Sequence, residues 1–276
     1  MRILFIGGTG IISSAAFALA VERGHELHVL NRSATSLRPL PEQAVQHTAD
    51  VRDPAGAREA LGDLEFDAVV DWLSFTPDHV RTATDLVRGR TGQYVFISSA
   101  SAYQTPPERL PVTESTPLRN PFWQYSRDKI ACEELLTALY RQEGYPMTVV
   151  RPSHTYDRTL VPFDGGWSFV ERMRRGQPVV VPGDGTSPWT LTHHTDFAGA
   201  LLPLLAQPRA LGEAFHITGT TPGRGTRSPA CWRAPPAWPT PSSCTCPRTP
   251  STPSTASGAP VCSATRATRW FSTTAR

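Results

Sequence analysis

The stretch "RILFIGGTGIIS", residues 2–13, decides the fold. It begins as a short, nearly continuous apolar run, the pattern of a strand buried in a parallel sheet. From residue 11 onward, apolar side chains recur at helical spacing until Gly24 stops the helix. In the turn between them, Gly7 permits a tight bend and Gly10 lets the backbone approach a ligand. A glycine-rich turn in this position predicts a dinucleotide site, because the amides and dipole at a helix start bind phosphate.

Strand and helix patterns continue to alternate after this turn. The sequence predicts strands over 26–32, 66–75, 92–103 and 146–156, a strand and loop over 45–53, and helices over 54–64, 77–90 and 125–144. Strict alternation favours right-handed crossovers and an α/β, Rossmann-type, doubly wound parallel sheet. We expect residues 1–156 to form an NAD(P)-binding domain. The looser pattern over 157–219 predicts a small, incomplete substrate lobe, with "AFHIT", residues 214–218, returning as a strand.

The composition changes abruptly after Gly219. Residues 220–276 contain no Asp, Glu, Leu, Ile or Met, while Pro, Thr, Ser and Arg abound. Such a segment buries too little apolar surface to offset its ordering entropy, so we expect it to be largely disordered. If the gene uses GC-rich codons, the part that encodes this segment can be read in a shifted frame. That frame yields sequences with the composition of an ordinary folded protein. We therefore hypothesise a frameshift near Gly219, which the gene's nucleotide sequence would test.

Charge and composition exclude several classes of protein. The formal charge is +3, but seven arginines lie beyond the last acidic residue, Glu213, which leaves about −4 for the remainder and no general signal for nucleic acid. No apolar run is long enough for a membrane span and no signal peptide is evident, so a cytoplasmic location is expected. The cysteines lack paired ligand spacing, and His193 and His194 have only Asp196 nearby. No metal is expected.

The end of the second predicted strand bears on the choice of cofactor. NAD-selective sites normally place a carboxylate there for the ribose 2′-hydroxyl. This chain has Asn31 and Arg32, and a guanidinium pairs well with a 2′-phosphate. The cofactor is therefore predicted to be NADP or NAD, with NADP slightly preferred. The alternative is that Arg32 is an ordinary solvated charge.

The segment "YSRDK", residues 125–129, contains the only lysine of the chain. Tyr125 and Lys129 are four residues apart on a predicted helix and share a face. A phenol needs its pKa lowered by roughly 3 units to exchange protons near neutrality, about 4 kcal/mol. An ammonium at about 4 Å supplies about 4 kcal/mol at an effective dielectric constant of 20. The alternative is an amphipathic helix carrying a tyrosine and a snorkelling lysine.

Serines follow the predicted strand that ends in "FISSASAY", residues 96–103. Ligands of open α/β sheets bind at the carboxyl ends of the strands. Ser99 is placed to donate to a substrate oxygen while Tyr125 takes or gives the proton, whereas Ser98 and Ser101 could merely satisfy the strand end. Together with Lys129 and a nicotinamide, this set would move a hydride between a carbinol and a carbonyl.

These motifs, with "DVRD", "RPSHTYD" and "GDGTSPWTLTHHTDFA", span residues 1–219. On them the chain resembles the extended short-chain dehydrogenase/reductase family, the NAD-dependent epimerase/dehydratase group. The resemblance implies that Ser99, Tyr125 and Lys129 are catalytic and that Lys129 also holds the nicotinamide ribose. The cofactor-binding set that it implies is Gly7, Thr9, Gly10, Ile11, Ile12, Asn31, Arg32, Asp50, Val51, Leu73, Tyr125, Lys129, Pro152 and His154.

Three positions depart from the family's pattern. Ser13 replaces the third glycine, which should slightly widen the packing of helix on strand. His154 stands where many relatives have Asn. Trp189 occupies the place where sugar-nucleotide enzymes commonly carry an arginine for the substrate's phosphates, which argues against a UDP-sugar.

The resulting function is an NAD(P)-dependent oxidoreductase or epimerase acting on a sugar-like or nucleotide-sugar substrate, with Tyr125 as acid and base. The expected partners are a small-molecule substrate and a second copy of the chain in a homodimer, without nucleic acid or membrane. The alternative is a non-catalytic NADP(H)-sensing or RNA-binding member of the same fold. A third possibility is an inactive product of a disrupted gene.

Overall fold

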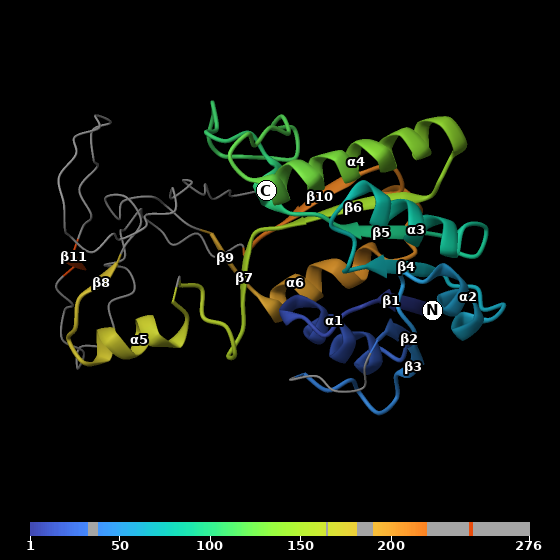
Figure 1. Cartoon of the computed structure of the whole chain (residues 1–276), viewed down its shortest axis with the longest axis horizontal. Helices are drawn as coiled ribbons and strands as arrows, with labels where there is room; N and C mark the ends of the chain where they lie inside the picture. Colours follow the sequence, from blue (N-terminus) through green and yellow to red (C-terminus); the bar gives the residue numbers. More distant parts are fainter. Residues whose placement is uncertain (33–37, 164, 181–189, 220–242, 245–276) are drawn as a thin grey trace, which may run out of the picture.

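The structure is a computed structural model that describes residues 1–32, 38–163, 165–180, 190–219 and 243–244. Its centre is a parallel sheet with the strand order β10-β6-β5-β4-β1-β2-β3 (Figure 1). The strands are β1 (Arg2–Ile6), β2 (Glu26–Asn31), β3 (Val45–Thr48), β4 (Ala68–Asp71), β5 (Tyr94–Ile97), β6 (Met147–Pro152) and β10 (Ala214–Ile217). The order reverses between β1 and β4, which confirms the doubly wound sheet and places the ligand crevice at their carboxyl ends.

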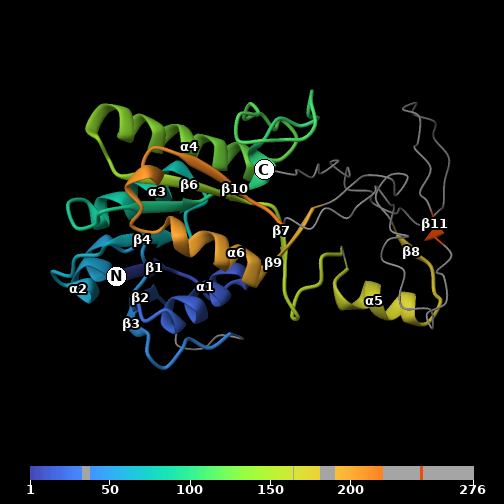
Figure 2. The same cartoon turned by 180° about the vertical axis from the view of Figure 1, so that it is seen from behind.

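Helices cover both faces of this sheet (Figures 1 and 2). One face carries α1 (Ile11–Glu22) and α6 (His194–Leu201), and the other carries α2 (Pro54–Leu61), α3 (Pro77–Val87) and α4 (Gln124–Glu143). Side chains of β1 alternate between the two layers, as a strand requires. Phe5 packs with Phe17 of α1 and Phe197 of α6, while Leu4 packs with Leu136 of α4. The sheet is therefore buried on both sides.

Local signals set the helix ends. Asp53 caps α2 by accepting a hydrogen bond from the Gly56 amide at 3.3 Å, and Thr76 caps α3 by accepting from the His79 amide at 3.4 Å. Each cap is followed by a proline at the first helical position. Gly144, with φ of 67°, ends α4 in the left-handed conformation.

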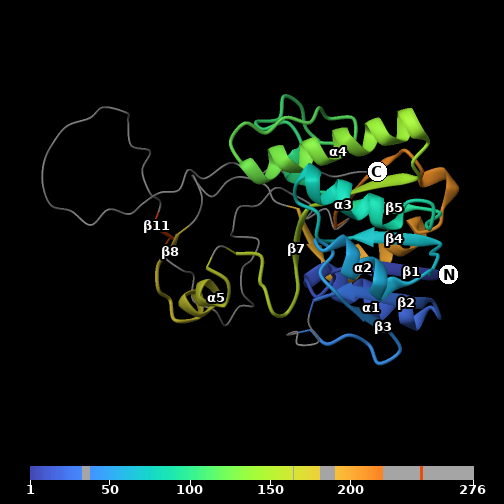
Figure 3. The same cartoon turned by 45° about the vertical axis from the view of Figure 1, so that its right-hand side comes forward.

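Smaller elements extend beyond the sheet. The strand β7 (His154–Tyr156) pairs with β9 (Leu191–His193), and β8 (Val179–Val180) pairs with β11 (Ser243–Cys244). The helix α5 (Trp167–Arg174) and β8 lie apart from the seven-stranded sheet (Figure 3). The 3₁₀ turns are η1 (Ala100–Ala102), η2 (Leu202–Leu204) and η3 (Pro208–Ala210). No helix within the described ranges is both long and apolar enough to cross a bilayer.

Every strand predicted after the glycine turn is shorter in the structure, and for two of them the cause is visible. The strand predicted over 92–103 ends at Ile97, because the Ser99 hydroxyl accepts a hydrogen bond from the Ser101 amide at 3.2 Å and starts η1. The strand predicted over 146–156 breaks at Ser153, after which β7 leaves the sheet to pair with β9. The predictions for Trp189 and for residues 220–242 and 245–276 lie outside the described residues.

Candidate active site

One cavity of about 880 Å³ runs along the carboxyl ends of the strands, from the turn after β1 to the end of β10. All fifteen residues that the sequence predicts for catalysis or cofactor binding line it. The cavity therefore joins segments that are far apart in the chain. The individual roles of these residues stay predictions.

The glycine turn after β1 combines two different requirements. Gly7 and Gly8 have φ of +80° and +115°, and a Cβ atom would lie 2.3 Å from the Leu73 side chain at Gly7 and 2.4 Å from Phe17 at Gly8. Both glycines are therefore needed by the fold itself. At Gly10 a Cβ atom would meet only the Ser13 hydroxyl at 3.4 Å, so packing does not demand glycine there. The bare backbone of Gly10 and the first amides of α1 fit the pyrophosphate of a dinucleotide.

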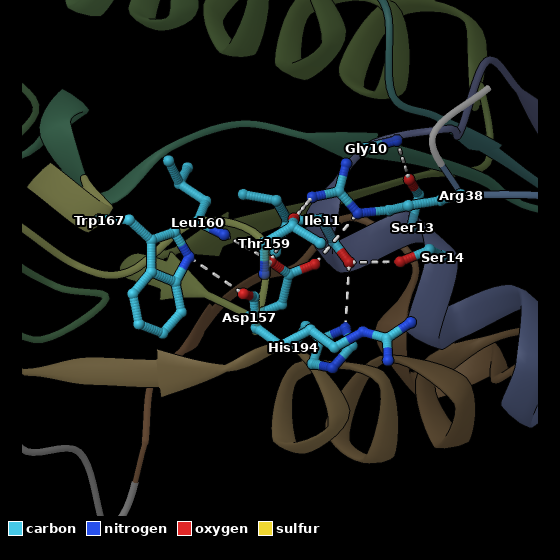
Figure 4. Close-up of polar contacts among 11 residues, drawn as sticks. Gly10, Ile11, Ser13, Ser14, Arg38, Asp157, Thr159, Leu160, Trp167 and His194 are labelled. Atoms are coloured by element: carbon cyan, nitrogen blue, oxygen red, sulfur yellow. Dashed lines mark hydrogen bonds and ion pairs between the residues drawn. The ribbon is translucent and has the colours of Figure 1, made fainter.

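Ser13 closes this turn. Its side chain is buried, and its hydroxyl accepts a hydrogen bond from the Gly10 amide at 2.9 Å (Figure 4). The replacement of the third glycine thus adds a hydrogen bond that holds the turn. Two further hydrogen bonds lie at the start of α1. The Ser14 hydroxyl donates to the Ile11 carbonyl at 2.8 Å, and His194 of α6 donates to the same oxygen at 3.3 Å.

A partly buried ion pair lies beside the glycine turn (Figure 4). Arg38 donates to the Asp157 carboxylate at 3.0 Å and also to the Thr159 hydroxyl. Burial would raise the pKa of Asp157, but hydrogen bonds from Thr159, Arg38 and the Leu160 amide hold it well below its usual range. The pair fastens residues 157–160 to the loop after β2, and Leu160 lines the cavity. The sequence did not predict this contact, which joins residues 119 positions apart.

Donor groups gather at the end of β2. The Asn31 side-chain oxygen accepts a hydrogen bond from Gln46 at 3.0 Å, which fixes the amide group. Its nitrogen is buried and has no partner among the described residues. Arg32 lies 3.8 Å from the Asp50 carboxylate, and its side chain is 68% exposed. This end of the cavity therefore offers a fixed amide donor and an accessible guanidinium.

Lys129 is buried in α4, and its amine donates to the carbonyls of Ser74 and Ile97, both at 2.7 Å. It also lies 4.8 Å and 4.6 Å from the ring centroids of Phe75 and Phe96. Burial lowers the pKa of the amine to about 8, against the opposing charge of Asp71. A compact ammonium fits between two carbonyls where a planar guanidinium would not, which explains the single lysine. Its third hydrogen is left for a ligand.

Tyr125 lies one turn before Lys129 on the same helix face and lines the same cavity. Burial raises the pKa of its phenol, while a hydrogen bond with Ser99 acts in the opposite direction. The expectation that the lysine charge lowers this pKa was wrong for the structure described. The amine lies 5.8 Å from the centre of the ring and is already held by two carbonyls, so burial dominates.

The structure separates the three serines after β5. Ser98 donates to the Glu133 carboxylate, which also binds Arg151 at 2.6 Å. The Ser101 hydroxyl accepts from Ser126 at 2.8 Å. Ser99 lines the cavity with Tyr125 and opposes the rise in the pKa of that phenol. The geometry therefore supports Ser99 for the role predicted from the sequence.

Unpaired polar groups converge on the cavity. Among the described residues, the buried side-chain nitrogens and oxygens without a hydrogen-bond partner belong to Asn31, Trp72 and His216, and all three residues line the cavity. Buried polar groups are nearly always satisfied, so this grouping indicates a site built for a polar ligand. Sequence reasoning missed Trp72 and His216. Their positions, just after β4 and near the end of β10, were a usable signal because ligands bind at carboxyl strand ends.

Aromatic rings surround the phenol. Trp123 lies 4.7 Å and Phe75 lies 6.3 Å from the Tyr125 ring, centroid to centroid, and both line the cavity. The two histidines considered for a metal have other contacts. His193 hydrogen-bonds the Thr195 hydroxyl at 2.7 Å, and no group of three or more potential metal ligands occurs within the described part of the chain.

A family model described as the NAD-dependent epimerase/dehydratase family matches residues 3–218. The chain belongs to this family. The match covers the sheet and both ends of the cavity.

Individual relatives share this region. The chain is 29% identical over 242 residues to 2′-dehydrokanamycin reductase of Streptomyces kanamyceticus, covering 84% of this chain and 64% of the relative. It is 26% identical over 230 residues to the chloroplast stem-loop binding protein of 41 kDa b of Arabidopsis thaliana, covering 79% and 58%. The chain thus spans less than two thirds of the length of these relatives.

Solved structures show the same fold. The dTDP-glucose 4,6-dehydratase of Bacillus anthracis, determined in complex with NAD, superposes with a TM-score of 0.69 at 18% identity, over 90% of this chain and 85% of that structure. At this identity the likeness establishes the fold alone.

Proposed function

We propose that this member of the NAD-dependent epimerase/dehydratase family is an enzyme that moves a hydride between a sugar-like substrate and a nicotinamide cofactor. The observation that carries the proposal is the meeting of Ser99, Tyr125 and Lys129 in the cavity that begins at the glycine turn. Reductases, epimerases and dehydratases of the family share this hydride step. A bound nicotinamide would accept or return the hydride.

The chain's own residues divide the remaining work. The Ser99 hydroxyl holds the reacting oxygen of the substrate, and the Tyr125 hydroxyl beside it gives or takes the proton. Lys129 offers its third N–H to a ribose hydroxyl of the cofactor. Phe75 and Trp123 provide flat, exposed apolar surface for a sugar ring.

The donors at the end of β2 support a preference for NADP. Asn31 supplies an unpaired amide nitrogen, and Arg32 supplies an accessible guanidinium, both suited to a 2′-phosphate. Arg32→Ala is expected to weaken NADPH binding about 10-fold, the value of one charge-assisted hydrogen bond, and NADH binding by less than about 2-fold. Calorimetric titration measures both constants. Arg23→Ala, an exposed arginine at the far end of α1, is the control, and equal effects on both cofactors would contradict the preference.

The cavity favours an unphosphorylated substrate. Among its described lining residues the lysine and arginine side chains are Lys129 and Arg32, of which the first is held by two carbonyls and the second lies at the β2 end. The described reactive end therefore offers no free cation for a diphosphate. Because the chain resembles 2′-dehydrokanamycin reductase, that ketone is a suitable test substrate, with UDP-glucose as the contrasting one.

The proposal is tested by replacing the phenol. Tyr125→Phe is expected to lower the rate of NADPH oxidation with 2′-dehydrokanamycin by about 10²-fold or more, because the proton donor is removed. Cofactor affinity should stay within about 2-fold, since the ring remains in place. Tyr140→Phe, on the exposed side of the same helix, serves as the matched control. Unchanged turnover in Tyr125→Phe would refute the assignment.

A second candidate function is RNA binding, which the similarity to a chloroplast stem-loop binding protein favours. It predicts an affinity for stem-loop RNA that falls steeply with salt. Filter binding by the full chain between 50 and 200 mM salt, roughly the range over which phosphate contacts are lost, distinguishes the two functions. Tight, salt-dependent binding that survives Tyr125→Phe would support the RNA-binding alternative.

A further inference from the structure

His216 stands at the far end of the cavity from the glycine turn. It lies near the carboxyl end of β10, its side chain lines the cavity, and only 7% of the residue is exposed. Neither ring nitrogen has a hydrogen-bond partner in the described part of the chain. An enclosed imidazole with both nitrogens unsatisfied is a rare and unfavourable arrangement unless a ligand completes it.

The neighbours of His216 hold it in place without satisfying its ring. Its backbone amide donates to the Glu114 carboxylate at 3.0 Å, and its ring lies 5.2 Å from that of Tyr103, centroid to centroid. The Tyr103 hydroxyl accepts from Arg151 at 3.3 Å, and Arg151 is bound to Glu133. These polar groups are therefore engaged elsewhere, and the imidazole stays available.

Strand register gives the distance from His216 to the reacting groups. His216 pairs with Arg151 of β6, and the Ser98 amide donates to the Val150 carbonyl on the same strand. Strands lie about 4.8 Å apart, so the backbone of His216 is about 10 Å from that of Ser98. At this separation His216 and Ser99 reach different positions of one sugar-sized molecule.

The protonation state of His216 narrows the kind of group it can bind. Burial lowers the pKa of the imidazole to about 4, and the positive charge of Arg151 adds to this effect while Glu114 opposes it. At neutral pH the ring is uncharged, with one N–H donor and one nitrogen acceptor. A phosphate or carboxylate would leave the acceptor unused. A hydroxyl group both donates and accepts, so it matches the ring in either tautomer.

We propose that His216 determines substrate specificity by hydrogen bonding to a hydroxyl group on a carbon other than the one that reacts. The inference rests on the proposed function and names the substrate class as an uncharged polyol region next to the reacting carbon. His216 contacts the substrate but takes no part in the proton or hydride transfer.

The first test compares 2′-dehydrokanamycin with its monodeoxy analogues in the full chain, using NADPH oxidation. The wild type is expected to discriminate by about 10²-fold in kcat/KM against the one analogue that lacks the hydroxyl read by His216. His216→Phe, which keeps a ring of similar shape, should reduce that preference to less than about 3-fold, with the change mainly in KM. His216→Gln, which keeps a donor and an acceptor, should restore part of it.

Controls separate the possible failures. His25→Phe, just before β2 and outside the cavity, should keep the wild-type preference, and thermal unfolding with NADP⁺ shows whether each variant is folded. An unchanged preference in a folded and active His216→Phe protein would overturn the inference while leaving the proposed function intact. Absence of any Tyr125-dependent reduction would instead overturn the proposed function.

A second measurement does not depend on turnover. Spectra of histidine labelled with ¹⁵N report the ring nitrogens directly. Kanamycin, the alcohol formed by reducing the test ketone, is added at saturation in the presence of NADP⁺. The signals of His216 are identified as those that the His216→Phe variant lacks. In the wild type, addition of kanamycin is expected to shift these signals toward the positions of hydrogen-bonded nitrogens. Signals that stay in place would contradict the inference.

Discussion

Two clusters, one half-buried and one buried, lie side by side where α4 packs against β5 and β6, and they are built from similar parts. The first joins Ser99 to Tyr125 and Lys129, and the second joins the preceding residue, Ser98, to Glu133 and Arg151. Each contains one serine after β5 and one buried cation. The sequence spacing alone does not distinguish them.

The difference lies in how the cation is paired. Arg151 binds the Glu133 carboxylate at 2.6 Å, with both side chains more than nine-tenths buried. Burial alone would lower the pKa of Arg151, but the carboxylate more than offsets this and raises it. Within the described residues, the hydrogen-bond partners of Lys129 are two neutral carbonyls, and burial lowers its pKa to about 8. We call the Arg151 cluster saturated, because a carboxylate pairs its cation, and the Lys129 cluster unsaturated, because its cation has no such partner among the described residues. The saturated cluster holds the fold together, whereas the unsaturated one can bind a ligand and exchange protons.

The largest expected effect follows from removing the unsaturated cation. Lys129→Met should lower kcat/KM with 2′-dehydrokanamycin by about 10²-fold, because the contact with the cofactor is lost and the carbonyls of Ser74 and Ile97 are left without their donor. Steady-state kinetics with NADPH measure the effect. Arg127→Met, an exposed cation on the same helix, should change it by less than about 2-fold. A Lys129→Met enzyme of normal activity would end the distinction between the two clusters.

Breaking the saturated cluster should affect stability instead. Glu133→Gln leaves Arg151 buried without a counter-charge, and the free energy of unfolding should fall by about 3 kcal/mol. The neighbouring exposed residue provides the control, and Glu134→Gln should cost less than about 0.5 kcal/mol. Urea unfolding measures both, while kcat of the folded Glu133→Gln protein should stay near the wild-type value. A stable Glu133→Gln protein that has lost activity would reverse the roles assigned here.

The pH dependence of stability distinguishes the two cations as well. The pKa of Lys129 is lowered from 10.5 to about 8 on folding, so between these values the unfolded chain binds the extra proton. Stability contributed by this group therefore rises as pH increases from about 8 to 10.5, by up to about 3 kcal/mol. The difference in unfolding free energy between the wild type and Lys129→Met should grow over that interval. A difference independent of pH would show that the amine titrates normally.

The adjacent serines give the smallest expected effects. Ser99→Ala should lower kcat about 30-fold, because the donor that holds the reacting oxygen is lost, with little change in stability. Ser98→Ala should leave kcat unchanged and cost about 1 kcal/mol of stability through its lost hydrogen bond to Glu133. Parallel kinetics and urea unfolding of the two variants form a matched comparison. Equal effects of the two substitutions on kcat would contradict it.

Local signals account for what the sequence predicted well. The apolar run of β1, the glycine turn and the alternation of strands with helices act over short segments, and they were sufficient to predict the sheet. The spacing of Tyr125 and Lys129 likewise requires only a helix. The rest depends on contacts between distant segments. Ser98 and Ser99 are distinguished by the residue of α4 that lies next to each, Glu133 for Ser98 and Tyr125 for Ser99. The pKa of Tyr125 is set by burial rather than by its neighbouring lysine.

Other features had no local signal at all. The Arg38 and Asp157 pair joins residues 119 positions apart, and the need for glycine at Gly8 arises from the Phe17 ring. His216 is one of eight histidines, and only the folded structure shows that its ring is buried, unpaired and on the cavity.

The single lysine permits a direct test of the central claim. Protein labelled with ¹³C at the lysine Cε position gives one side-chain signal, from Lys129, which can be titrated with and without NADP⁺. We expect the signal to titrate near pH 8 in the free protein and to shift when the cofactor binds. A signal that titrates near 10.5 and does not respond to NADP⁺ would place the amine in solvent and contradict the assignment of this cavity as the active site.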